Sequence, residues 1–187
     1  MATPDISRED VQAFCQDHFL AGLPRYVLVQ VANWALPAEC FPNVATMVKK
    51  KGGKLVLGWH LWEIPGLLLE AEYHCVWEKP SGILVDITPQ RPGYEEERIL
   101  FVPRRKDRLG KNPPDNIRRP LSNDEDIALM CNLKEQYVKL SAQGEPEGTP
   151  GHYRLPIDVA RRIEVIMAEH QTVMARLTER YPDRFKA

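Results

Sequence analysis

The sequence lacks a long hydrophobic run, an N-terminal leader pattern and a surplus of charge of one sign. Its apolar runs fall far short of the ~18 residues that cross a bilayer, which argues against a membrane span. The first ten residues have no basic start followed by an apolar stretch, so we expect no secretory signal and a cytoplasmic protein. With 25 Lys and Arg against 26 Asp and Glu, the net charge of −1 argues against nucleic acid or an anionic membrane as partner.

The four cysteines contain no Cys-x-x-Cys pair, which argues against a zinc knuckle or a dithiol redox motif. In a reducing compartment we expect all four thiols, Cys15, Cys40, Cys75 and Cys131, to be free. The composition is otherwise globular, with 43% hydrophobic and 27% charged residues over 187 positions, typical of a single domain. We expect no cofactor and no resident metal.

Hydrophobic periodicity divides the chain into helical and extended segments. Helices are predicted over 7–20, 39–51, 123–141 and 156–180, and strands over 54–64, 69–77, 83–88 and 98–102, while the apolar run 26–31 fits either a buried strand or the start of another helix. The order favours an α+β fold: a central antiparallel sheet of about four strands, a helix bearing Cys40 packed on it, and C-terminal helices. We expect a core over 1–121 and a helical extension over 122–187 that packs on this core, so that the chain forms one domain overall. The helices of the extension are expected to cover a face of the sheet or to mediate contacts in a homodimer.

Strands 69–77 and 83–88 are joined by a turn sequence, KPSG, and are predicted to form a hairpin. If the turn centres near residue 80, His74 lies opposite Asp86, and Cys75 faces the apolar side. A slip of the turn would shift this opposition, but the alternation places His74 and Asp86 on one face. A carboxylate there can orient an imidazole.

Cys40 stands at the predicted start of helix 39–51. A helix dipole and unpaired amides at that end stabilise a thiolate, and the same amides can hold the oxyanion of a tetrahedral intermediate. Cys40, His74 and Asp86 therefore form a candidate triad of nucleophile, base and orienting carboxylate.

The three segments 39–43 (ECFPN), 72–77 (EYHCVW) and 85–89 (VDITP) carry Cys, His and Asp in that order. Over roughly residues 33–102 this arrangement resembles the papain-like and transglutaminase-like cysteine enzymes, in particular their small amidohydrolase and deamidase members. The resemblance implies a papain-like core in 1–121 and a thiol-protease-like hydrolase, deamidase or acyl transferase acting on an amide or ester carbonyl. A peptide, a glutamine side chain and a peptidoglycan stem all remain open as substrates.

Further polar and aromatic side chains are candidates for the oxyanion hole or the substrate cleft: Asn33, Asn43, Trp59 and Trp62. A basic, proline-broken segment over 104–119 begins with Arg104, Arg105 and Lys106, which are candidate contacts to an anion or a partner. Two alternatives stay open. The chain could be a non-catalytic module that binds a protein or nucleic acid through this segment, or a small zinc protein using Cys40, His60, His74 and Asp86.

Overall fold

The computed structural model describes residues 1–19, 22–104, 114–146 and 153–185. The chain divides into two compact units, Met1–Arg119 and Pro120–Lys186. No helix within these described ranges is long and apolar enough to cross a membrane. The expectations that the helical part packs on the core, and that the protein is cytoplasmic, stay predictions.

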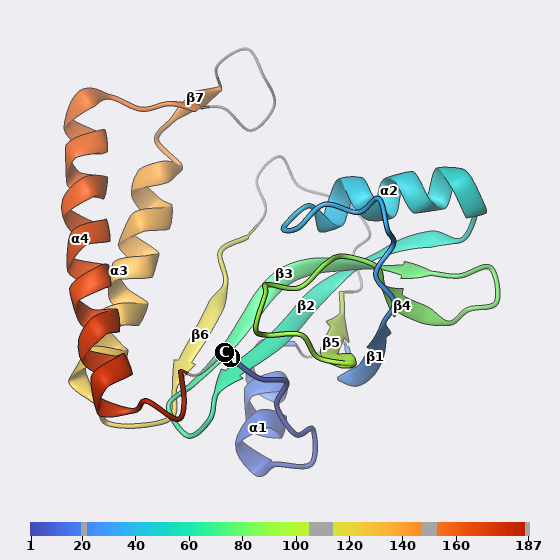
Figure 1. The fold of residues 1–187 in the computed structure, drawn as a ribbon, viewed down its shortest axis with the longest axis horizontal. Coiled ribbons are helices and arrows are strands. Elements are labelled where there is room, and N and C mark those ends of the chain that lie inside the picture. The colour runs from blue at the N-terminus through green and yellow to red at the C-terminus, as the bar shows by residue number, and fades with distance from the viewer. Residues whose placement is uncertain (20–21, 105–113, 147–152, 186–187) are drawn as a thin grey trace. The chain divides into compact units, whose positions relative to one another are not determined.

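The first unit is a sheet with two helices (Figure 1). Its elements are α1 (Glu9–His18), β1 (Arg25–Val29), α2 (Cys40–Lys51), β2 (Lys54–Ile64), β3 (Leu68–Glu78), β4 (Leu84–Asp86), β5 (Arg98–Pro103) and β6 (Ile117–Pro120). The strand order is β2-β5-β1-β4-β3-β6, and β2 also pairs with β3. That additional pairing closes the sheet on itself, with β6 added beside β3.

The predicted α+β class is confirmed, with differences in the sheet. Six strands are present in the described residues instead of about four, because β1 joins the sheet and β6 forms inside the segment expected to be irregular. The sheet is mixed, since β1 and β4 run parallel while the other registered pairs run antiparallel. A parallel neighbour needs a long crossover, here the chain from α2 through β3, which local periodicity cannot reveal.

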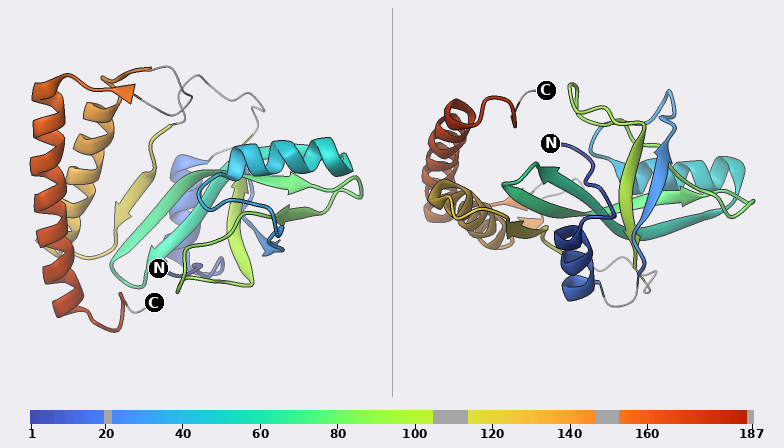
Figure 2. Two further views of the ribbon diagram at one scale, coloured as in Figure 1. Left: turned by 45° about the horizontal axis from the view of Figure 1, so that its top comes forward. Right: turned by 90° about the horizontal axis from the view of Figure 1, so that it is seen from below.

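The closed sheet has one face packed under α2 and a second, inner face. Cys40, Val44 and Met47 recur at helical spacing on α2 and pack with Leu57 and Cys75 of the sheet. Alternate positions of the strands form a separate cluster on the inner face: Val27, Val76, Ile99 and Phe101. Figure 2 shows α2 lying along the sheet from two further directions.

The inner cluster explains a glycine in the middle of β2. A Cβ atom on Gly58 would lie 2.3 Å from the carbonyl oxygen of Val102 and 2.4 Å from the ring of Phe101. Both distances are shorter than any van der Waals contact, so the close approach of β5 requires glycine at this position.

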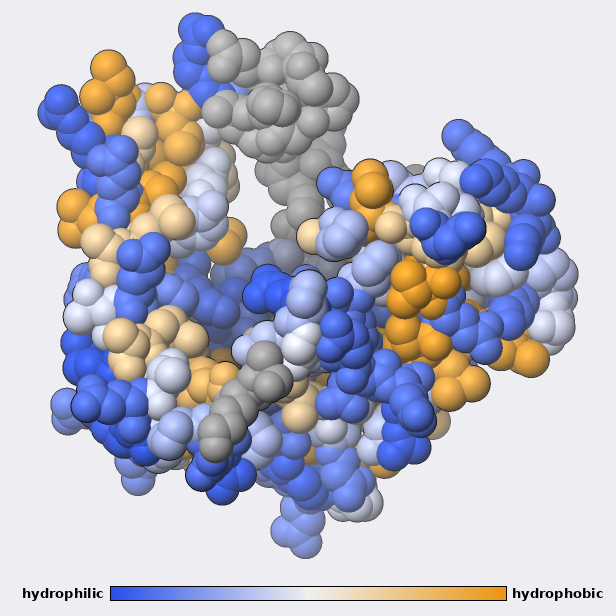
Figure 3. Space-filling model, in the orientation of Figure 1, coloured by the Kyte–Doolittle hydropathy of each residue, from blue (hydrophilic) through white to orange (hydrophobic). Residues whose placement is uncertain are grey.

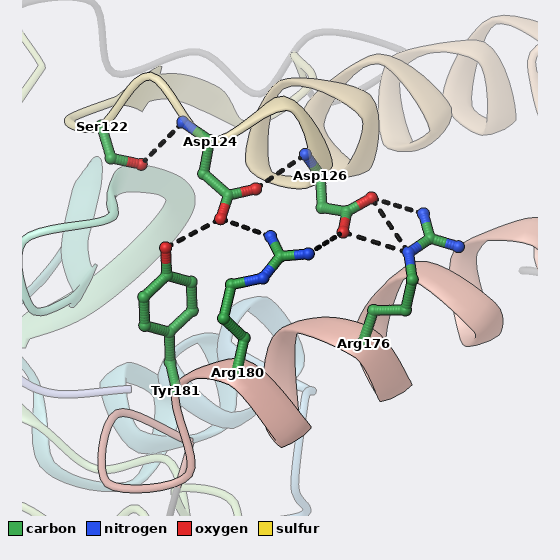
Figure 4. A network of polar contacts seen from close by, with 6 residues as sticks. All are labelled: Ser122, Asp124, Asp126, Arg176, Arg180 and Tyr181. Atoms are coloured by element: carbon green, nitrogen blue, oxygen red, sulfur yellow. Dashed lines mark hydrogen bonds and ion pairs between the residues drawn. The ribbon is translucent and has the colours of Figure 1, made fainter.

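The second unit is a helical hairpin, α3 (Glu125–Ser141) and α4 (Ile157–Arg180), with the short strands β7 (Glu145–Pro146) and β8 (Tyr153–Arg154) between them. Asp124 caps α3 by accepting a hydrogen bond from the Asp126 N–H. The carboxylates of these two residues bind the guanidinium groups of Arg176 and Arg180 on α4, and the Tyr181 hydroxyl donates to Asp124 (Figure 4). This network ties the start of α3 to the end of α4.

Candidate active site

Cys40 is the first residue of α2, as the sequence predicted. Within the described part of the chain, the backbone N–H groups of Cys40 and Phe41 have no hydrogen-bond partner, and Pro42 has no N–H. The first amide with an acceptor is that of Asn43, which donates to the Glu39 carbonyl. The helix therefore begins with two free donors beside the Cys40 thiol, as an anion at a helix N-terminus requires.

His74 and Asp86 meet inside the fold. Nε2 of His74 lies 3.0 Å from Oδ2 of Asp86, and the two side chains are 9% and 2% exposed. The contact lies beyond the β3–β4 ladder, whose registered pairs are Trp77 with Val85 and Glu78 with Leu84. The triad thus occupies the place where β4 stops pairing with β3.

The predicted opposition of His74 and Asp86 in the hairpin is wrong by two residues. The turn runs over 79–83, closed by the Lys79 N–H on the Ile83 carbonyl and by Gly82 at φ +83°. Opposed residues therefore sum to 162 instead of 160. A shift of two preserves the alternation, so His74 and Asp86 still share a face and meet diagonally.

His74 and Cys75 lie close enough to the Cys40 thiol to shift its pKa. The Cys75 thiol is the largest influence and lowers the pKa of Cys40 well below its ordinary value, against burial, which raises it; His74 lowers it further. His74 Nε2 is held by Asp86. Hydrogen bonding from Cys75 and from His74 favours the charged form of the Cys40 thiol, which is why its pKa falls.

The pKa values of the neighbouring groups shift in the complementary sense. Burial would lower the pKa of His74, but the charge and hydrogen bond of Asp86, with those of Cys40, hold it well above its usual range. The hydrogen bond to Cys40 and burial raise the pKa of Cys75 far above that of a free thiol. The site therefore favours a Cys40 thiolate beside a His74 imidazolium, with Cys75 as a neutral donor.

Asp86 and the segment before Cys40 are held by one hydrogen-bond chain. Oδ1 of Asp86 accepts from the Thr88 N–H at 3.0 Å, and Thr88 Oγ1 lies 3.4 Å from Asn43 Nδ2. Asn43 also accepts from the Leu36 N–H and donates to the Leu36 carbonyl. Asn43, proposed from the sequence as an oxyanion or substrate residue, is thus engaged in fixing the loop that leads into Cys40.

The other predicted cleft residues are spread over different surfaces. Trp59 is half-buried on the Cys40 side of the sheet, with ring centroids 5.5 Å from Phe19 and 5.4 Å from Tyr73. Trp62 stacks on His60 at 3.9 Å and donates to Glu72. Asn33 is exposed and lines a surface pocket between α2 and the 30–34 segment.

Sequence reasoning assigned Cys75 to the core and considered His60 only as a half-buried strand histidine or as a ligand of the alternative zinc site. Alternation correctly placed Cys75 on the apolar face, but it could not show that α2 lays Cys40 over that position. The His60 ring lies 5.5 Å from that of His74, and its buried Nε2 has no hydrogen-bond partner among the residues that the structure describes. Burial lowers the pKa of His60 well below its usual range, so it is a neutral neighbour of the imidazolium.

The basic segment is described only in part. Arg104 is exposed, with its guanidinium carbon 5.8 Å from the centre of the Tyr73 ring. Arg105 and Lys106 lie outside the described residues. Further along, Arg118 binds Glu70 at 3.0 Å and Arg119 binds Asp17 at 2.7 Å, so these two cations are used within the fold.

The zinc interpretation gains no support from the geometry. Among the described residues, no group of three or more His, Cys, Asp or Glu side chains is arranged to hold a metal ion. The ring of His60 lies near that of His74. No contact between His60 and Cys40 is found among the described residues.

Comparisons of this chain with protein-family models, with curated proteins and with solved structures found no match.

Proposed function

We propose that this chain is a cysteine-dependent enzyme that acts on an amide or ester carbonyl through Cys40, His74 and Asp86. One observation carries the proposal: His74 is held by Asp86 at 3.0 Å, and it lies near enough to Cys40 for each to shift the pKa of the other. These are the contacts that a thiol nucleophile, its base and an orienting carboxylate need. The papain-like kinship is part of this proposal and rests on the order of the three residues and their elements.

Each group has a defined part in the reaction. The Cys40 sulfur attacks the carbonyl carbon, and the oxygen that becomes negative is placed beside the free N–H groups of Cys40 and Phe41. The bond between the carbonyl carbon and the leaving amine or alcohol then breaks, and His74 gives its proton to that leaving group. The acyl group stays on Cys40 as a thioester. A water or an amine then attacks the thioester, His74 takes its proton, and the Cys40 thiolate leaves. Asp86 fixes the ring throughout.

Burial fixes the positions of the Cys40 and His74 side chains and limits the access of a substrate to them. Cys40 is 6% exposed and His74 is 7% exposed, so little of either side chain is open to solvent. Hydrolysis, deamidation and acyl transfer share the first half of this mechanism. The acceptor of the acyl group distinguishes them.

Trapping the acyl-enzyme tests the proposal. The full chain is mixed with a small activated ester, p-nitrophenyl acetate, and acetylated peptides are located by mass spectrometry. We expect acetyl on Cys40 within the first turnover, with at least a hundredfold slower modification in His74→Ala. Cys15→Ser is the matched control and leaves the reaction unchanged. Acetylation of Cys40 at the same rate in His74→Ala, or none on Cys40, contradicts the proposal.

A further inference from the structure

A pocket beside α2 is not used by the proposed chemistry. It encloses about 320 Å³ and is lined by the 30–34 segment, the second half of α2 and the facing parts of β3 and β4. Trp34 and Trp77 contribute indole rings, and Met47, Val85 and Ile87 contribute an apolar floor. The pocket is therefore suited to a side chain with an apolar stem.

The charged groups at this pocket are all positive. Lys51 and Lys79 line it, no acidic residue does, and Lys50 lies with its ammonium 4.2 Å from the centre of the Trp34 ring. Figure 3 shows hydrophilic surface over the end of α2 that carries Lys50 and Lys51, next to a hydrophobic area.

These lysines are not neutralised by carboxylates in the described part of the chain. Lys79 Nζ donates to the neutral amide oxygen of Gln30 at 3.1 Å. The carboxylates nearest along the chain are engaged elsewhere, since Glu78 pairs with Lys54 and Asp86 is held by His74. An anion in the pocket would therefore meet the ammonium groups of Lys51 and Lys79.

The pocket lies on the same side of α2 as Cys40, but packed side chains separate the two. Cys40, Met47 and Lys51 are separated by seven and four residues and share one face of α2. On that face Val44 is 0% and Met47 is 6% exposed, and both pack on the sheet. At 1.5 Å per residue, Lys51 stands about 16 Å from Cys40 along the helix. The pocket is therefore a site apart from Cys40.

We propose that this pocket binds a carboxylate of a peptide, at a site apart from Cys40. The inference goes beyond the proposed function and does not rest on it. The carboxylate has two sources, an acidic side chain or a peptide C-terminus, and both present the same charge to Lys51 and Lys79.

Binding is measured on the full chain carrying Cys40→Ala, so that no turnover occurs. Three probes are compared: an acetylated and amidated decapeptide with two adjacent Glu residues, the same peptide with Gln in their place, and the Gln peptide with a free C-terminus. We expect at least one carboxylate peptide to bind about tenfold more tightly than the neutral one, with the advantage reduced by salt. The tighter of the two identifies the source.

Charge reversal locates the binding. Lys51→Glu combined with Lys79→Glu should abolish the advantage of the carboxylate peptide, whereas Lys49→Glu, an exposed lysine of the same helix outside the pocket lining, should leave it unchanged within about twofold. Equal binding of all three peptides overturns the carboxylate site, as does an equal loss in Lys49→Glu. Because Cys40 is absent from this assay, failure of the carboxylate site is separate from failure of the acylation test.

Discussion

His74 Nε2 lies 3.0 Å from Asp86 Oδ2 across a gap in the sheet, beyond the point at which β3 and β4 stop pairing. Had the two strands stayed paired, β4 backbone would occupy the edge of β3 that Cys40 approaches. Instead the backbone N–H of Cys75 is available to the Cys40 sulfur. The short β4 is thus the local feature that admits the thiol to its base.

The thiol of Cys75 is predicted to tune the nucleophile. In Cys75→Ala the thiolate of Cys40 loses the neighbour that lowers its pKa most, so the pKa of Cys40 should rise. The pH profile of alkylation of Cys40, read by mass spectrometry, measures this shift. The matched control is Cys15→Ala, which removes another buried thiol, one whose pKa burial raises to about 11, and should leave the Cys40 profile in place. An unchanged profile in Cys75→Ala would show that the contact between the two sulfurs has no influence.

Asn43 is predicted to matter for stability more than for substrate contact. In Asn43→Ala the Leu36 N–H and carbonyl lose their side-chain partner, which should lower the free energy of unfolding by about 1–3 kcal/mol. Urea unfolding checks this value, with Lys49→Ala as an exposed control on the same helix. A neutral effect of Asn43→Ala would mean that the loop before Cys40 does not depend on these bonds.

The ion pairs of the helical hairpin predict a loss of stability in acid. The hydrogen bond of Arg176 holds the pKa of Asp126 below its usual value, and that of Arg180 does the same for Asp124. A carboxyl with a lowered folded-state pKa stabilises the fold above its unfolded-state pKa, and this stabilisation disappears as the pH falls through the folded-state value. Thermal unfolding between neutral pH and acid should therefore show a steeper decline in Tm for the parent chain than for Asp126→Asn. Parallel declines would contradict this assignment.

The sequence predicted those features that depend on local patterns. β2 was expected over 54–64 and is found there, because this stretch is rich in apolar and aromatic residues and Gly52 and Gly53 precede it. His74 and Asp86 were placed on one face because residues alternate between faces along their strands, and a register error of two residues left that conclusion intact. The start of α2 at Cys40 followed from its prolines, terminal lysines and glycines.

Features that depend on distant segments were not predictable. The sheet closes because β2 pairs with β5 as well as with β3. The β2–β5 pairing joins residues about 40 positions apart in the sequence, and no local pattern indicates it. The approach of Cys75 to Cys40 depends on how α2 lies over the sheet. Residues 114–120 were expected to be irregular because the segment is rich in charge and proline. They include β6, in which Arg118 forms an ion pair with Glu70 of β3, a contact that the sequence alone does not indicate.

The most direct test of the central claim is the reactivity of Cys40 towards iodoacetamide between pH 5 and 9, with all four cysteines followed in the same sample. We predict that Cys40 is alkylated well below the midpoint of about 8.5 of a free thiol, and that His74→Ala or Asp86→Asn moves its midpoint upward. Cys15, whose pKa burial raises to about 11, should stay unreactive over the whole range. A Cys40 that titrates with the other thiols, or whose profile is the same in His74→Ala, would contradict the thiolate–imidazolium pair.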